Sequence, residues 1–221
     1  MKLLLTSGGI VPEIKKDFFS LLNTKPSDCK IVLVNTAIYG EELTPKDIED
    51  YKESTSEQLR NCGITQIEEI DLRKQTPQSL SLILNDKDIL VINGGNTFYL
   101  LYWIKKNKLD SVIKEQLQRG LVYVGISAGS YIACPTIEAA GWKNQDKNRI
   151  RLKDLIALNL VDFLIMAHYS ENYKPILEKE IKTTKFPMVA LTDEQAILVK
   201  DSRIRLVGEK TKTFYNGFRE N

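Results

Sequence analysis

Short, continuously apolar runs alternate with segments of helical periodicity, and this alternation restricts the fold more than any other feature of the chain. Apolar runs occur at 30–35 (KIVLVN), 88–92 (DILVI) and 121–124 (LVYV). Runs that are apolar on both faces are typical of buried parallel strands. The segments with helical spacing are 44–62, 77–84, 97–106 and 109–119. The sequence therefore predicts a doubly wound α/β fold, with a mostly parallel sheet and helices on both of its faces.

Further elements are predicted before and after these segments. They are strands at 2–6 and 66–72, a helix at 13–22, a strand at 163–167, a helix at 170–183 and short strands near 188–191, 196–200 and 204–207. Residues 138–151 form a long excursion, and loops of such length in a compact domain are often functional. No repeat, low-complexity tract or linker rich in Pro, Gly or Ser divides the chain, so we expect a single α/β domain over 1–221.

The composition restricts the compartment and the classes of partner. The chain has 31 basic and 29 acidic residues, and its net charge of +2 attracts neither nucleic acid nor an anionic membrane. Cys29, Cys62 and Cys134 lack metal-ligand spacing, and their odd number argues against a disulfide framework. The N-terminal apolar run is too short for a signal peptide, and no run has the length of a membrane span. We expect a cytoplasmic protein with no metal or other cofactor and no nucleic-acid or membrane partner.

A Gly-x-Ser-x-Gly motif follows the last of the buried strands. It reads Gly125-Ile126-Ser127-Ala128-Gly129 and leads into Ser130-Tyr131-Ile132-Ala133, the start of a helix of small residues. A strand, a glycine-flanked serine and a helix are what a nucleophile elbow requires, because the sharp turn exposes the serine hydroxyl above the sheet edge. The alternative is a serine in an ordinary strand-to-helix turn. The context favours a functional Ser127.

A second strand-to-helix junction carries glycines. The strand at 88–92 ends in Asn93-Gly94-Gly95-Asn96-Thr97. Two glycines at such a junction place free backbone N–H groups beside the pocket at the carboxyl ends of the strands, where they suit an oxyanion or a carboxylate. A plain turn is the alternative. No Gly-Lys-Ser/Thr follows, which disfavours a phosphate loop.

The only histidine, His168, comes where the strand at 163–167 ends. A serine hydroxyl needs an adjacent base near pH 7, and an imidazole with an ordinary pKa of about 6.5 suits that task. A third group should orient the imidazole, and Asp193 and Glu194 lie at the end of another short strand. Period-two alternation puts their side chains on opposite faces, so only one points inward. The residues alone do not choose between them, and a solvated turn is the alternative for either.

Together these segments resemble the peptidase E and cyanophycinase family of serine peptidases. The resemblance is carried by Gly94-Gly95-Asn96-Thr97, by Gly125-Ile126-Ser127-Ala128-Gly129-Ser130 with Ala133-Cys134-Pro135-Thr136-Ile137, by Ala167-His168 and by Leu191-Thr192-Asp193-Glu194-Gln195-Ala196-Ile197. It implies a fold like the class I glutamine amidotransferases, which is flavodoxin-like, and a serine-type hydrolase. It also implies Ser127 as nucleophile, His168 as base and the amides of Gly95 and Ala128 as oxyanion donors.

The chain departs from peptidase E in two places. Peptidase E has an aspartate fifteen residues after the nucleophile, a proposed triad member, where this chain has Trp142. Cyanophycinase instead resembles an enzyme with a Ser-His-Glu triad, and its glutamate lies in the segment that Glu194 matches. The resemblance to cyanophycinase therefore favours Glu194 over Asp146 or Asp193 as the third triad member. The arginine that reads the substrate aspartate in peptidase E has no clear counterpart, and Lys174 and Lys182 are the nearest cations in the sequence.

These observations predict a cytoplasmic serine exopeptidase that hydrolyses short peptides through an acyl-enzyme. The resemblance to peptidase E extends this expectation to dipeptides with N-terminal aspartate. Gly94, Gly95, Asn96 and Ala128 are the predicted oxyanion and substrate-binding residues, and Ser127, His168 and Glu194 the predicted triad. Two alternatives are an amidase or isopeptidase of cyanophycinase type and a catalytically silent binding protein on the same scaffold. We expect a small peptide as the partner and a monomer or homodimer as the assembly.

Overall fold

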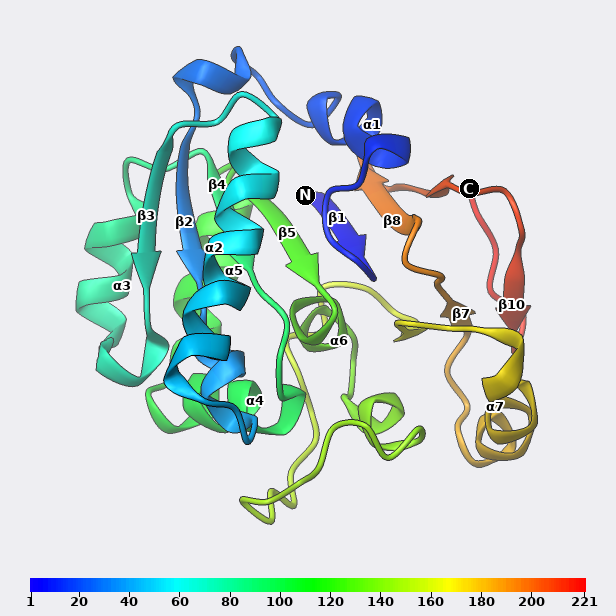
Figure 1. Cartoon of the computed structure of the whole chain (residues 1–221). Coiled ribbons are helices and arrows are strands. Elements are labelled where there is room, and N and C mark those ends of the chain that lie inside the picture. The colour runs from blue at the N-terminus through cyan, green and yellow to red at the C-terminus, as the bar shows by residue number, and fades with distance from the viewer.

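Two β-sheets form the framework of the protein in the computed structural model, which describes residues 1–221 (Figure 1). The larger sheet has seven strands in the order β3-β2-β4-β5-β1-β8-β9, and the smaller has three in the order β10-β7-β6. The strands are β1 (Lys2–Thr6), β2 (Lys30–Val34), β3 (Gln66–Ile70), β4 (Ile89–Ile92), β5 (Val122–Ile126), β6 (Leu164–Met166), β7 (Met188–Ala190), β8 (Gln195–Lys200), β9 (Arg203–Gly208) and β10 (Thr213–Tyr215). Strands β1 to β5 pair in parallel, whereas β8 and β9 join antiparallel.

Seven α-helices connect or follow these strands. They are α1 (Lys15–Phe19), α2 (Pro45–Asn61), α3 (Pro77–Leu84), α4 (Thr97–Lys106), α5 (Asp110–Gln118), α6 (Ala128–Ala133) and α7 (Lys174–Glu180). Helices α3 and α4 have the predicted bounds, and Thr44 begins α2 through a reciprocal capping box with Asp47. The helix predicted at 170–183 is shorter, because Pro175 at its first turn fixes the start of α7 and 3-10 turns flank it.

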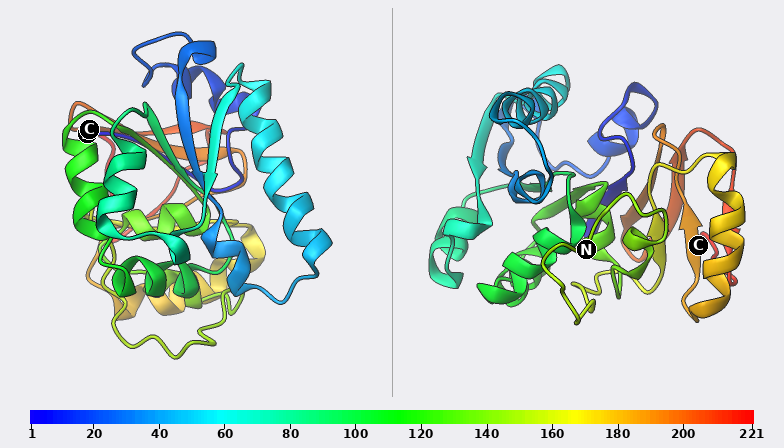
Figure 2. Two further views of the ribbon diagram at one scale, coloured as in Figure 1. Left: turned by 90° about the vertical axis from the view of Figure 1, so that its left-hand side faces the viewer. Right: turned by 60° about the horizontal axis from the view of Figure 1, so that its bottom comes forward.

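The larger sheet has a hydrophobic core on each face. Leu3 and Leu5 of β1 point into one core and Leu4 points into the other, as the period of two requires. Phe18 of α1 and Leu59 of α2 belong to the second core, while α3 to α6 contribute to the first. Helices α2 and α5 accordingly lie on opposite sides of the sheet (Figure 2, left). The predicted doubly wound, mostly parallel α/β fold is confirmed.

The connections that follow β1 and β5 leave the carboxyl edge of the sheet toward opposite faces. These strands are neighbours, and Thr6 at the end of β1 pairs with Ile126 at the end of β5. After β1 the chain passes to α1 on one face, and after β5 it passes to α6 on the other. Adjacent connections that diverge in this way leave a crevice outside the strand ends, where ligands of open α/β sheets bind.

The smaller sheet brings the second half of the chain to the same edge. The excursion at 138–151 begins with a 3-10 turn at Glu138–Gly141 and is followed by β6, which pairs in parallel with β7. Strand β10 was not predicted, because its three half-buried residues carry no repeating pattern. The larger core contains residues of both sheets, and the single-domain organisation over 1–221 stays a prediction. None of the helices combines the length and the apolar character needed to cross a membrane.

Candidate active site

Ser127 occupies a sharp turn between β5 and α6. Its backbone has φ 47° and ψ −103°, a conformation that side-chain-bearing residues rarely adopt. Both flanking glycines are needed for close approach. A Cβ on Gly125 would lie 2.6 Å from the carbonyl carbon of Gly129, and a Cβ on Gly129 would lie 2.1 Å from the oxygen of Ile92. The turn therefore holds the serine at the carboxyl edge of the sheet.

His168 lies beside Ser127 although 41 residues separate them in the sequence. It follows β6, and its ring nitrogen Nε2 is 2.8 Å from the hydroxyl oxygen of Ser127. Its backbone is left-handed, with φ 53°. The side chain is 40% exposed, so the imidazole borders the crevice instead of being enclosed by the core.

Asp193, and not Glu194, contacts the other ring nitrogen of His168. The Asp193 carboxylate oxygen Oδ1 is 2.6 Å from Nδ1 and also accepts a hydrogen bond of 2.7 Å from the Ser7 hydroxyl. The hydrogen bond with His168, followed by that with Ser7, holds the pKa of Asp193 below its ordinary value although partial burial acts against it. The side chain of Glu194 is exposed.

The prediction that favoured Glu194 is therefore corrected by the geometry. That preference came from the resemblance to cyanophycinase, while strand alternation only placed the two side chains on opposite faces; β8, however, begins at Gln195, after both residues. The two residues instead lie at the centre of a turn, which the Gln195 N–H closes by donating to the Thr192 carbonyl over 3.1 Å. A turn aims side chains by its own dihedral angles, so alternation does not apply to it.

Asp146 and Asn96 support the neighbouring loop. The Asp146 carboxylate accepts from the backbone N–H of Thr97 over 2.8 Å at the start of α4, and burial raises its pKa. The Asn96 side chain caps the same helix by accepting from Tyr99 N–H over 3.0 Å, and it donates to the Lys147 carbonyl over 3.1 Å. Both side chains thus join the excursion at 138–151 to α4. Trp142, where peptidase E has an acid, packs against the larger core.

Two backbone N–H groups beside Ser127 are available to a ligand. Ala128 is the first residue of α6, and the first amides of a helix have no acceptor within it. The Gly95 N–H donates to no protein group, whereas the Gly94 N–H donates to the Asn93 side chain over 2.8 Å. Gly95 has φ 119°, and a Cβ there would lie 2.5 Å from the backbone of Ala37. Gly95 and Ala128 can therefore serve as a donor pair, and Gly94 cannot.

Gly94 instead leaves space next to the nucleophile. A Cβ on Gly94 would lie 3.4 Å from the Ser127 Cβ and 2.3 Å from the Tyr51 hydroxyl. Burial raises the pKa of Tyr51 to about 12. The adjoining cleft has a volume of about 270 Å³. It is lined by Ser7, Gly8, Tyr51, Ser54, Thr55, Gln58, Asn93, Ile126, Ser127, His168 and Asp193.

Ser7 and Lys143 are site residues that the sequence analysis missed. The Ser7 hydroxyl accepts from the His168 backbone N–H over 2.7 Å, and the Lys143 ammonium donates to the carbonyls of Ala167 and His168 over 2.6 and 3.3 Å. Burial lowers the pKa of Lys143 to about 8. Ser7 directly follows a strand, so the rule that placed Ser127 and Gly95 at strand ends could have indicated it. Lys143 left no such signal, because a lysine within an irregular loop is usually solvated.

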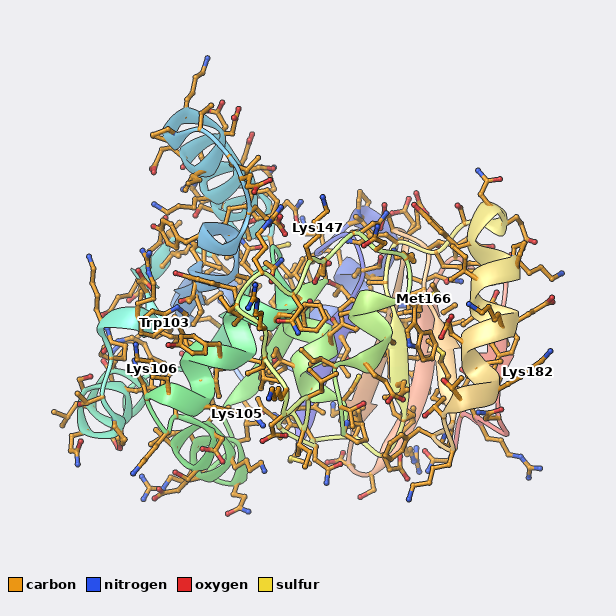
Figure 3. All side chains as sticks on the ribbon, turned by 90° about the horizontal axis from the view of Figure 1, so that it is seen from below. Trp103, Lys105, Lys106, Lys147, Met166 and Lys182 are labelled. Carbon is orange, nitrogen blue, oxygen red and sulfur yellow. The ribbon has the colours of Figure 1, made fainter.

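The two cations that the sequence offered for substrate binding lie elsewhere. Lys174 begins α7 and is exposed. Lys182 follows the same helix and points outward at the margin of the molecule in Figure 3, which looks onto the carboxyl ends of the parallel strands. Lys147, on the excursion, lies over the middle of that view. Lys143 is thus the buried cation of this site.

The site thus has a serine, a histidine and a carboxylate joined by hydrogen bonds at the carboxyl edge of an α/β sheet. This arrangement is typical of enzymes that attack acyl groups. The sequence profile of Peptidase family S51 matches residues 3–207, and the chain belongs to this family. It is therefore a peptidase, and hence a hydrolase.

Relatives and solved structures agree with this assignment. An uncharacterized peptidase of Listeria innocua is 31% identical over 173 residues, which cover 76% of this chain and 82% of the relative. A peptidase E of Shewanella amazonensis is 30% identical over 177 residues, covering 76% and 72%. The crystal structure of a candidate peptidase E of Listeria monocytogenes superposes with a TM-score of 0.77 at 26% identity, covering 95% of this chain and 98% of that one. A peptidase from an acI-B1 actinobacterium shares the fold, with a TM-score of 0.71 at 18% identity over 100% and 92% of the chains.

Proposed function

We propose that the protein is a serine-type exopeptidase that hydrolyses short peptides, with Ser127, His168 and Asp193 as its triad. One observation carries the proposal: a continuous path of hydrogen bonds, 2.8 Å from Ser127 to His168 and 2.6 Å from His168 to Asp193. Both lengths lie within the range that a nucleophile, its base and the orienting group require. The strained elbow of Ser127 supports the same roles.

The proposed reaction has two halves. The Ser127 oxygen attacks the peptide carbonyl carbon while its proton passes to Nε2 of His168. The tetrahedral intermediate then collapses, the carbon–nitrogen bond breaks, and the imidazolium gives its proton to the leaving amine. Water next attacks the acyl-enzyme, with His168 as base, and releases the acid and free Ser127. Asp193 keeps the other ring proton on Nδ1 and stabilises the imidazolium.

The amides of Gly95 and Ala128 are the proposed oxyanion donors. Negative charge develops on the carbonyl oxygen only as the tetrahedral intermediate forms, and preorganised donors stabilise it without reorganisation. Gly95 supplies its free N–H from the loop after β4 and Ala128 from the start of α6. The two donors thus come from the ends of neighbouring strands.

The cleft supports a small substrate. A volume of about 270 Å³ suits a short peptide and not a folded chain. Among short peptides we include dipeptides with N-terminal aspartate, which the resemblance to peptidase E implies. We further propose a reducing, cytoplasmic location, since all three cysteines are free and buried. The proposed partner is the peptide substrate alone, acting on a monomer or homodimer.

A panel of dipeptides tests this function. Purified protein should release free amino acids from part of the panel, and Ser127→Ala should lower kcat by several orders of magnitude while the protein stays folded. A fluorophosphonate probe should label the wild type and not this variant. Hydrolysis confined to isopeptide substrates would move the assignment to an isopeptidase, and near-normal turnover by Ser127→Ala would overturn the serine mechanism.

A further inference from the structure

The backbone of His168 needs support from its surroundings. Its φ of 53° lies in the left-handed region, which is uncommon for residues with a side chain and persists only where neighbouring contacts determine it. The conformation matters because it aims the imidazole at Ser127 and Asp193 together. Strand β6 ends two residues earlier, at Met166, and the next backbone bond to the chain after β7 comes from the Tyr169 N–H to the Leu191 carbonyl over 2.9 Å, so the His168 N–H and C=O themselves depend on side chains.

We propose that Ser7 and Lys143 are positioning residues that hold the His168 backbone from both sides and so fix the imidazole between Ser127 and Asp193. The inference rests on the proposed function, because it assigns the imidazole a task. Neither residue touches the reacting atoms. Each acts through His168, and Ser7 acts through Asp193 as well.

Ser7 connects three elements through one hydroxyl. The hydroxyl donates to Asp193 Oδ1 over 2.7 Å and accepts from the His168 backbone N–H over 2.7 Å. Its own backbone N–H donates to the carbonyl of Gln195, the first residue of β8, over 3.3 Å. Ser7 is fully buried, with 0% of its surface exposed, so its hydroxyl lies between these partners and not in solvent. It therefore sets the distance between His168 and Asp193.

Lys143 holds the opposite side of the same peptide segment. Its ammonium donates to the carbonyls of Ala167 and His168, and it lies 4.9 Å from the centre of the Tyr173 ring. Only 9% of the residue is exposed, yet the ammonium forms no ion pair with a carboxylate. Asp146 and Asp193 are the acidic groups that influence it at longer range. Burying a charge costs free energy unless the charged group is hydrogen-bonded. Here the acceptors are the carbonyls of the segment that carries His168.

The two residues thus oppose one another across the peptide group that joins Ala167 to His168. Ser7 holds its N–H over 2.7 Å and Lys143 holds its C=O over 2.6 Å, and they come from segments 136 residues apart by their numbers. Removing either one frees one side of the left-handed residue. A small displacement of the imidazole from its productive position is enough to lower the rate by about 10²-fold.

The test compares Ser7→Ala and Lys143→Met with the wild type. Lys143→Met keeps the length of the side chain and removes its donors. Each variant should lower kcat roughly 10-fold or more and change KM by less than about twofold, because the contacts to substrate remain. Ser27→Ala and Lys153→Met are matched controls, since both residues are exposed.

A second readout does not depend on activity. His168 is the only histidine, so its ring proton on Nδ1 is a single, unambiguous NMR signal. The hydrogen bond to Asp193 should protect this proton from exchange in the wild type and in Ser127→Ala, whereas Ser7→Ala and Lys143→Met should broaden or lose it. If Ser7→Ala does not fold, Ser7→Cys keeps the shape of the side chain with a slightly larger atom and a weaker donor, and it should show the same loss in reduced form.

The two readouts separate the possible failures. Unchanged kcat together with an unchanged ring-proton signal in Ser7→Ala and Lys143→Met would overturn the positioning roles. Absence of hydrolysis by the wild type would instead remove the proposed function. In that case the NMR comparison still decides whether the two residues hold the imidazole.

Discussion

Ser127 combines a strained backbone with a half-buried hydroxyl at the cleft, and the strain is expected to cost stability. A residue held at positive φ with ψ near −103° stores on the order of 1–3 kcal/mol, which glycine avoids. Glycine also gives the unfolded chain more freedom, at a cost of about 0.4–1 kcal/mol. We therefore expect Ser127→Gly to be more stable than Ser127→Ala by about 1 kcal/mol, while both variants lose hydrolysis.

Urea unfolding of the two variants measures this difference. Both variants lack the serine hydroxyl, so the difference between their free energies of unfolding reports the backbone strain at residue 127. If Ser127→Gly were the less stable of the pair, the elbow would not be strained in solution.

The choice between the two adjacent carboxylates is also a residue-scale question. Both side chains are exposed, but only Asp193 contacts Nδ1 of His168. Replacing the corresponding aspartate by asparagine in chymotrypsin-type proteases costs about 10⁴-fold, and we expect Asp193→Asn to lower kcat by about 10²-fold or more. Glu194→Gln should remain within about threefold of the wild type, since a solvated side chain away from the imidazole adds little.

Steady-state kinetics of the two variants on one substrate decide the matter. Asp146→Asn belongs in the same series, because its carboxylate caps α4 and does not contact the imidazole. A larger loss in Glu194→Gln than in Asp193→Asn would restore the arrangement that the resemblance to cyanophycinase implied.

At the scale of elements, the site depends on how closely α6 approaches the sheet. A Cβ on Gly129 would lie 2.1 Å from the Ile92 carbonyl oxygen of β4, and backbone cannot yield as a flexible side chain can. Gly129→Ala must therefore shift α6 away from β4, and overpacking of this kind costs about 1–3 kcal/mol. Since Ala128 begins α6, the same shift should displace an oxyanion donor and lower kcat.

Thermal unfolding and kinetics of Gly129→Ala check both effects. Gly141→Ala is the control, because its Cβ would lie at an ordinary 3.4 Å from the Phe98 ring. Equal melting temperatures for the two variants would show that the packing of α6 against β4 does not require glycine at position 129.

At the scale of the whole molecule, Lys143 should make stability depend on alkaline pH. Burial lowers its pKa to about 8 in the folded protein, against about 10.4 when the chain is unfolded. Between these values the unfolded chain binds more protons than the folded one, so stability rises as pH increases through this window. The full effect of such a difference is at most about 3 kcal/mol, at about 1.4 kcal/mol for each pKa unit.

Lys143→Met supplies the reference for this effect, since other groups that titrate between pH 8 and pH 10.5 contribute to both proteins. The free energy of unfolding of the wild type, relative to this variant, should increase across the window. A constant or falling difference would mean that the Lys143 ammonium is solvated.

The elements of the large sheet, and the parts of the site that follow its strands, could be predicted from the amino-acid sequence alone. Continuous apolar runs predicted β2, β4 and β5, because a strand covered on both faces can contain little else. The glycines around Ser127 and at Gly94-Gly95 marked strand ends, since only glycine permits the close approaches found there. These signals are local, and a local pattern can be read without knowing the fold.

The side chains that meet at the histidine, in contrast, could be identified only from the folded structure. The resemblance to cyanophycinase favoured Glu194 over Asp193, but a turn of four residues aims Asp193 at the imidazole. Ser7 and Lys143 reach His168 from opposite ends of the first two-thirds of the chain. At His168 their partners are backbone groups, which every residue carries alike, so the sequence does not reveal these pairings, even though Ser7 stands at a strand end. Contacts of this kind are fixed by the geometry of the assembled strand ends, and that geometry exists only once the chain has folded.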